Sequence, residues 1–290
     1  MYWRILAAFA SAALAPINGA VAASASHEMI PRGAWVADFS DEACSLERKF
    51  SDGENDATLR LRQFGPQRDF EVTLVSKSLG LKLRNARYAF LPGEKQDLEF
   101  YQTFKIPGGE RGVLFSATQF KSNPDSTFGN LAPATLAEEM QAADGLLLEN
   151  VFNSDFTFRT GPLREPMKVM QTCLDDLLSQ LGLDAKAHRN LSRPVTEIGD
   201  KAWPNWLETP QLRAIEQWPS DRMQFRLLVD EMGHVADCRI TGAAEYAELS
   251  QKICSVMPKN YEFLPALDNG GNPIRSYYLT TITRVHRSSY

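Results

Sequence analysis

The residues with the clearest capacity for chemistry are four cysteines, Cys44, Cys173, Cys238 and Cys254. An even number of cysteines in an exported chain indicates disulfides, and four cysteines allow three pairings. Proximity along the chain and the domain organisation described below favour the pairs Cys238–Cys254 and Cys44–Cys173. We interpret both as structural, because redox-active thiols generally lie close together, as in Cys-x-x-Cys.

Zinc binding is the competing use of these cysteines. Structural zinc sites usually carry pairs of ligands two to four residues apart, and no two of the cysteines have that spacing. His234 and Cys238 do, but on a strand this spacing corresponds to ~13 Å, which is too far to share one ion. We therefore expect no metal site.

Familiar catalytic motifs are absent from the sequence. It contains no G-x-S-x-G, H-E-x-x-H, P-loop or G-x-G-x-x-G, and the neighbouring Asp175 and Asp176 would not face each other on a helix. The histidines lie near the chain ends, in a linker or in a turn, where we expect them to be solvated: His27, His188, His234 and His286. We predict no catalytic residue, no cofactor and no enzymatic activity.

The start of the chain has the pattern of a secretory signal peptide, which we place at residues 1–23. Arg4 precedes an apolar run from Ile5 to Ala15, and small residues with Ala-x-Ala spacing follow. The run is short against the ~20 residues of a membrane-spanning helix, and no later run reaches that length. We expect a periplasmic protein without a membrane span in the mature chain. The alternative is an inner-membrane anchor, if the signal is not cleaved.

Composition narrows the range of partners. The chain is 43% hydrophobic and 23% charged, as is ordinary for a globular protein. Its net charge is −5, and it has no basic tract. These features argue against nucleic acid and against an anionic lipid surface as partners.

Residues 30–184 have the pattern of one β-rich domain. Short stretches alternate apolar and polar residues, as in ATLRLRQF and FEVTLVSKS, and turn signals such as FGPQRD and IPGGE separate them. We predict an antiparallel sheet, either a sandwich or a curved open barrel. The segment REPMKVMQTCLDDLLSQLG has helical periodicity and is expected to close the domain. Cys173 lies at the edge of its apolar stripe, from which it could reach Cys44.

Residues 185–209 are polar, marked by proline and aperiodic, and we interpret them as a linker. Residues 210–290 form a second unit, so the fold class is α+β. FRLLVD and VADCRI alternate as strands around a turn with Gly233 at the position that needs positive φ. EYAELSQKICSVM has an amphipathic helical stripe. Strand and helix must meet to bury their apolar residues, which brings Cys238 to Cys254.

Three motifs of this unit occur in a recognisable order: FRLLVDEMGHVADCRIT, AELSQKIC and YEFLPALDNGGNPIRSYY. Together they resemble the C-terminal domain of TonB-type energy transducers. Phe263, Pro265, Ala266, Gly271 and Pro273 are similar to that family's F-x-P-A-x-x-x-x-G-x-P signature. The resemblance covers residues 210–290 and implies a β-β-α-β unit with a preceding helix.

The resemblance also implies that the last strand lies at a sheet edge and pairs with an extended peptide of an outer-membrane receptor. In such strand addition, main-chain hydrogen bonds supply the affinity. The candidate edge is residues 276–283, with its binding residues at Ser276, Tyr277, Tyr278, Leu279, Thr280 and Thr281. The alternative is an ordinary edge strand protected by Arg275, Arg284 and Arg287.

TonB-type transducers also have an N-terminal membrane helix and a long proline-rich spacer, and we find neither pattern in this sequence. We therefore predict a periplasmic binding or adaptor protein with a TonB-like C-terminal module. Its partner would be an envelope protein or peptide segment bound by strand pairing, with a link to TonB-type transport. The alternative is an exported hydrolase whose site lies in the N-terminal β-rich domain.

Overall fold

The computed structural model describes residues 26–66, 69–98, 101–118, 142–198, 222–241, 247–255 and 262–283. The predicted signal peptide, the later part of the predicted linker and the helix that the resemblance places before the second unit lie outside these residues. So do Arg284 and Arg287.

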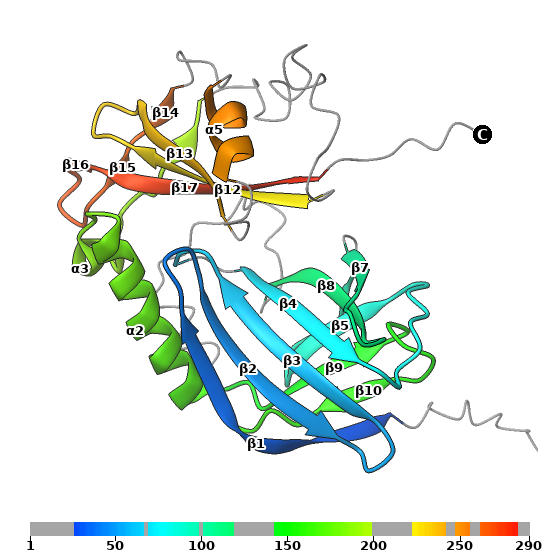
Figure 1. Cartoon of the computed structure of the whole chain (residues 1–290). Coiled ribbons are helices and arrows are strands. Elements are labelled where there is room, and N and C mark those ends of the chain that lie inside the picture. The colour runs from blue at the N-terminus through cyan, green and yellow to red at the C-terminus, as the bar shows by residue number, and fades with distance from the viewer. Residues whose placement is uncertain are drawn as a thin grey trace, which may run out of the picture.

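Ten strands form one curled sheet, in the order β6-β5-β9-β10-β1-β2-β3-β4-β8-β7. Their bounds are β1 His27–Phe39, β2 Cys44–Ser51, β3 Asp56–Gln63, β4 Asp69–Ser76, β5 Arg87–Leu91, β6 Gln96–Asp97, β7 Tyr101–Lys105, β8 Arg111–Thr118, β9 Gly145–Glu149 and β10 Phe156–Phe158. In Figure 1, β2, β3 and β4 lie in front, and β5, β9 and β10 lie behind them. The described protein is thus β-rich, with a curled sheet as its largest element.

The prediction of a purely antiparallel sheet is wrong at one pair of strands. β1 pairs in parallel with β10 through His27–Met29 and antiparallel with β2 from Ile30 to Phe39. β10 is held on its other side by an antiparallel pairing with β9. Its direction relative to β1 therefore follows from long-range closure of the sheet, which no local turn specifies.

Alternation of side chains gives the curled sheet its inner and outer faces. On β3, Ala57, Leu59 and Leu61 are buried, whereas the intervening Arg60 pairs with Glu47 on the outer face at 2.6 Å. Inside, the rings of Phe50 on β2 and Phe158 on β10 meet edge to face, with centroids 5.3 Å apart. The space inside the curl is therefore a packed core.

Helix α2 (Arg164–Gln180) covers one side of this core, next to β1 and β2 (Figure 1). Its stripe Met167, Met170, Leu174 and Leu177 is buried, as the periodicity predicts. The predicted Cys44–Cys173 disulfide is confirmed, with a Cα–Cα distance of 5.9 Å, within the usual range. It bonds the helix to the first residue of β2.

A smaller sheet has the order β13-β12-β17. Its strands are β12 (Arg222–Val229), β13 (Val235–Thr241) and β17 (Ser276–Thr283), and helix α5 (Ala247–Ser255) packs on it. Phe225, Leu227, Ile240, Ile253 and Phe263 belong to a second core cluster. The Cys238–Cys254 disulfide is also confirmed, with Cα atoms 5.7 Å apart. Helix α5 lies on the face of the small sheet that points away from the large sheet (Figure 1).

Two short ladders complete the small unit: β11 (Thr196–Glu197) with β14 (Phe263–Leu264), and β15 (Ala266–Leu267) with β16 (Pro273–Ile274). β11 belongs to the predicted linker, and so does helix α3 (Ala185–His188). The side chain of Asp184 caps α3 by accepting from the backbone N–H groups of Lys186 and Ala187. The first part of the predicted linker is thus held by capping and strand pairing, which leave no periodic pattern in the sequence.

Removal of each disulfide tests its structural role. In the chain-entropy model the cost grows with the length of the closed loop, and the sequence separations are 129 and 16 residues. We expect the Cys44→Ser/Cys173→Ser variant to lose ~5 kcal/mol of unfolding free energy and the Cys238→Ser/Cys254→Ser variant ~3 kcal/mol. Urea unfolding of both variants beside the wild type measures the difference. The reverse order would contradict this account.

A Gly233→Ala substitution tests how closely β14 approaches the β12–β13 turn. A Cβ atom at Gly233 would lie 2.0 Å from the Phe263 carbonyl oxygen, and the φ of Gly233 is +88°. Gly271 is the matched control, because its φ is +79° but nothing lies within 4 Å of its added Cβ. We expect Gly271→Ala to cost about 1–2 kcal/mol through backbone strain and Gly233→Ala to cost about 1–3 kcal/mol more through overpacking. Equal losses on thermal unfolding would refute the close contact.

Candidate functional site

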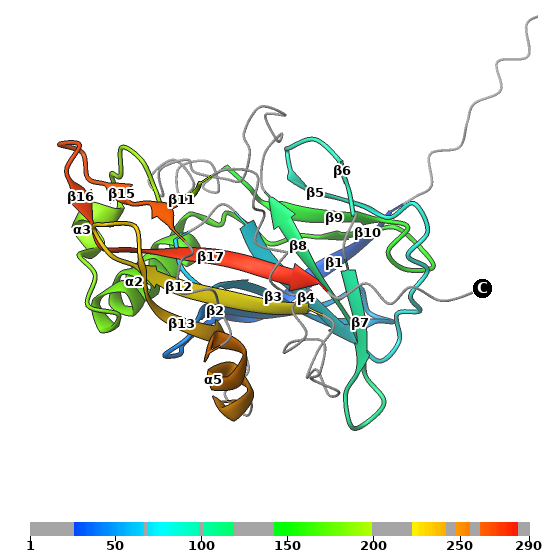
Figure 2. The same cartoon turned by 90° about the horizontal axis from the view of Figure 1, so that it is seen from above.

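The predicted binding residues 276–281 all lie on β17, which is an edge strand of the small sheet. β17 pairs with β12 along its whole length, from Ser276 opposite Val229 to Thr283 opposite Arg222. Within the described part of the chain, β12 is the one strand that pairs with β17. Figure 2 shows β17 and β13 on opposite sides of β12. The candidate site is thus an eight-residue strand with one of its main-chain edges paired.

One face of β17 belongs to the core of the small unit. The ring of Tyr278 lies 4.9 Å from that of Phe263, measured between centroids. The Tyr278 hydroxyl donates to the Glu197 carboxylate on β11. Tyr278 is therefore used to hold the short β11–β14 ladder against the sheet.

The other face of β17 contacts the large unit. The Tyr277 hydroxyl donates to the carbonyl oxygen of Pro66 at 2.6 Å, and burial raises the pKa of Tyr277. A Cβ atom at Gly65 would lie 3.0 Å from both Leu279 and Tyr277, so the backbone of the β3–β4 turn lies directly against these side chains. On this face, the predicted binding residues Tyr277 and Leu279 are thus in contact with the large unit.

An apolar cluster extends this contact between the units. Leu178 at the end of α2, Leu183 and Leu228 on β12 are buried together, with Tyr277 packed against them. Arg226, also on β12, is 3% exposed, and its guanidinium donates to the Glu42 carbonyl oxygen at 3.4 Å. Burial lowers the pKa of Arg226, but an arginine stays charged in proteins. The small sheet therefore faces the large unit with both apolar and charged groups.

His188 is a member of this interface, and the prediction that it is solvated is wrong. It is 2% exposed, and its ring stacks on Tyr277 with centroids 6.0 Å apart. Nδ1 lies 2.7 Å from the Asp184 carbonyl oxygen and Nε2 lies 3.0 Å from Ser276 Oγ. A carbonyl can only accept, so Nδ1 carries the proton and the Ser276 hydroxyl donates to Nε2. Burial lowers the pKa of His188.

A serine that donates to a histidine also occurs in nucleophilic catalysis. Here Ser276 is 1% exposed and lies inside the contact between α3 and β17. The pair holds two elements together in this arrangement. Neither His188 nor Arg226 carried a sequence signal for this role, because their partners Ser276 and Glu42 come from distant segments.

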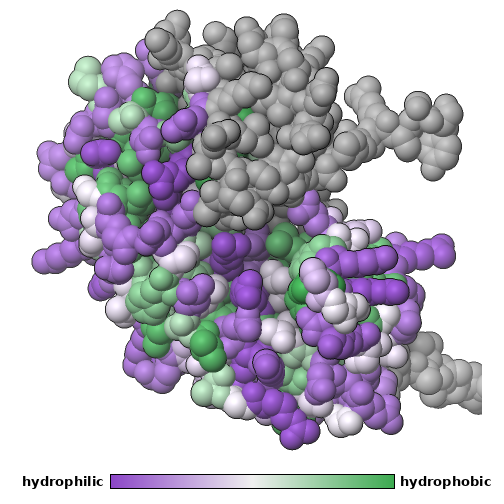
Figure 3. All heavy atoms as spheres, viewed as in Figure 1, coloured by the Kyte–Doolittle hydropathy of each residue, from purple (hydrophilic) through white to green (hydrophobic). Residues whose placement is uncertain are grey.

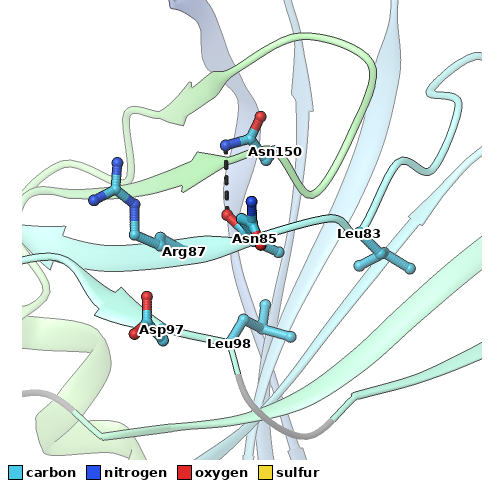
Figure 4. Close-up of a pocket in the computed structure, with 7 residues that line it drawn as sticks. Leu83, Asn85, Arg87, Asp97, Leu98 and Asn150 are labelled. Atoms are coloured by element: carbon cyan, nitrogen blue, oxygen red, sulfur yellow. Dashed lines mark hydrogen bonds between the residues drawn. The ribbon is translucent and has the colours of Figure 1, made fainter.

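A separate depression lies in the large unit, where the turn after β9 meets the segment that leads into β5 (Figure 4). It is lined by Leu83, Asn85, Ala86, Arg87, Asp97, Leu98 and Asn150. The Asn150 amide donates to the Asn85 carbonyl oxygen at 3.4 Å, and Arg87 pairs with Glu149 at 2.7 Å. None of its lining residues is a serine, cysteine or histidine.

The described residues also bear on the metal and membrane expectations. No three His, Cys, Asp or Glu side chains among them are grouped so that they could hold a metal ion. None of the helices in these segments combines the length and apolar character needed to cross a membrane. On the face seen in Figure 3, hydrophobic residues lie in small groups separated by hydrophilic ones.

Comparison of the chain with protein-family models, with curated proteins and with solved structures finds no match.

The Tyr277 hydroxyl provides a test of the contact between the units. In Tyr277→Phe the Pro66 carbonyl loses its donor, and we expect a loss of about 1–3 kcal/mol of unfolding free energy. Tyr101→Phe is the matched control, because Tyr101 is 43% exposed, and we expect it to be nearly neutral. Denaturant unfolding measures both variants, and similar values for the two would show that the Tyr277–Pro66 bond contributes little.

Proposed function

We propose that this chain is an exported binding or adaptor protein that captures an extended segment of an envelope protein at the edge of β17. The observation that carries the proposal is the position of β17: it pairs with β12 on one side and, among the described residues, with no strand on the other. An unpaired edge offers alternating N–H and C=O groups to an incoming strand. Eight residues are long enough for several such hydrogen bonds.

The resemblance to the C-terminal domain of TonB-type transducers supports this function. The order β12, β13, α5, β17 is consistent with the β-β-α-β unit that the resemblance implies. The signature residues also have physical roles here. Phe263 is buried in the small core, Pro265 accepts through its carbonyl from Arg193 at 2.9 Å, and the Gly271 N–H donates to the Asp268 carbonyl oxygen at 3.0 Å in the turn.

The two faces of β17 suggest how a partner would be selected. Tyr278 faces the small core and Tyr277 faces the large unit, so the first part of the strand has side chains engaged on both of its faces. Affinity would come from the main chain of β17. Selectivity would come from the groups next to the added strand. These are the small unit on one face and the β3–β4 turn of the large unit on the other.

We place the protein in the periplasm, with its partner in the envelope, such as a receptor segment of the kind that TonB-type transducers contact. Two disulfides are typical of an oxidising compartment, and the signal-peptide pattern agrees with export. An energy-transducing role is not part of the proposal. The described depression gives no support to the hydrolase alternative.

Proline substitution at neighbouring positions of β17 tests strand addition. The N–H groups of successive residues point to opposite edges of a strand, so one of Leu279→Pro and Thr280→Pro removes a bond to β12 and the other removes an outward N–H group. Circular dichroism and thermal unfolding identify the variant that keeps its fold. We expect that variant to lose capture of its partner from envelope extract at least tenfold.

The second variant is the control for fold damage, since it loses a bond of the sheet and should be less stable. Purified partner segments identified with the wild type are then titrated against the stable variant. Undiminished binding to the stable variant would rule out the edge of β17 as the binding site.

A further inference from the structure

We propose that His188 and Ser276 form a pH-sensitive latch that holds β17 on the α2–α3 segment at neutral pH and loosens it in mild acid. The latch would control the contact between the small sheet and the large unit. The inference does not depend on the proposed partner, because it rests on contacts within the chain.

Geometry fixes the state of the ring. Asp184 is the N-cap of α3, so the helix holds its carbonyl oxygen in place. This oxygen accepts a hydrogen bond from Nδ1–H of His188 at 2.7 Å. On the opposite side of the ring, Ser276 Oγ lies 3.0 Å from Nε2 on a strand that is paired throughout with β12. The neutral tautomer with its proton on Nδ1 satisfies both partners.

A second proton would change the charge more than the hydrogen bonds. The Ser276 hydroxyl can turn and accept from a protonated Nε2, but the imidazolium would then carry its charge inside the interface. His188 and Ser276 are 2% and 1% exposed, and the ring lies against Tyr277. A buried charge is costly, and burial outweighs the favourable effect of Asp184 on the protonated ring, so protonation favours any arrangement that returns the ring to water.

Two titratable groups act on the ring or touch it. Asp184 accepts from Nδ1 through its carbonyl oxygen and acts on the ring through its charge, and the Tyr277 ring stacks on the imidazole. A phenol is neutral at these pH values, and burial raises the pKa of Tyr277 further. Asp184 favours the protonated ring, but burial is the larger effect, and the pKa of His188 is lowered.

The direction of the pH effect follows from this lowered pKa. An unfolded or released histidine binds its proton near pH ~6.5, whereas His188 in the latch does so at a lower pH. The stabilisation is fully present above pH ~6.5 and is lost as the pH falls from there toward the folded value. Mild acid therefore weakens the contact between α3 and β17, next to Tyr277 and its bond to Pro66.

The test measures amide hydrogen exchange of β12 and β17 from about pH 8 to about pH 5, corrected for intrinsic rates, in the full chain. We expect protection in the wild type to fall below pH ~6.5 by up to tenfold per pH unit, as one bound proton allows. His188→Gln keeps a neutral side chain that can accept from Ser276, and should not show this fall. His234→Gln is the matched control: its histidine is exposed in the β12–β13 turn, and it should behave as the wild type.

Two further readouts keep the proposal testable if His188→Gln does not fold. Titration of the His188 ring by NMR in the wild type should give a midpoint below ~6.5, and a midpoint at or above that value would overturn the latch. Ser276→Ala should lower the protection of β17 at every pH while its acid sensitivity persists. Unchanged protection in Ser276→Ala, or parallel pH profiles for wild type and His188→Gln, would also overturn it.

Discussion

The packing of helix α2 is the constraint on which the rest of the structure depends. One stripe of the helix, including Met170 and Leu174, is buried in the large core, and its end reaches the second unit through Leu178, which packs with Leu183 and Leu228. A helix is rigid over this length, so its position in the large core also sets where α3 and the small sheet lie. The Cys44–Cys173 disulfide prevents the helix from leaving the sheet and so maintains both contacts.

This arrangement decides what β17 has available for recognition. On one face of the strand, Tyr278 packs in the small core. On the other face, Tyr277 and Leu279 contact the large unit. Among the described residues, the main-chain edge of β17 that points away from β12 is paired with no other strand. The proposed binding mode uses this edge, as the resemblance to TonB-type domains implies.

Local physical chemistry made several elements predictable. The period-2 pattern of β3, the helical stripe of α2 and the positive φ of Gly233 each depend on residues that are close in sequence. Both disulfide pairings were also predicted, because the apolar faces of strand and helix leave few ways to bring the cysteines together. The resemblance placed the candidate edge at residues 276–283, and the structure places these residues on β17, with strand addition remaining a proposal.

Other features depend on contacts that no sequence window contains. The parallel pairing of β1 with β10 follows from closure of a ten-stranded sheet, and the burial of Arg226 follows from the approach of the segment that contains Glu42. His188 lies in a polar segment and looks solvated until Ser276, 88 residues away, is placed against it. The sequence by itself determined the periodic strands, helix α2 and the two disulfides, but not α3 or β11, which lie in the segment predicted as a linker. Only the tertiary structure decided which polar groups became buried, because desolvation depends on what packs above a residue and not on its neighbours in the chain.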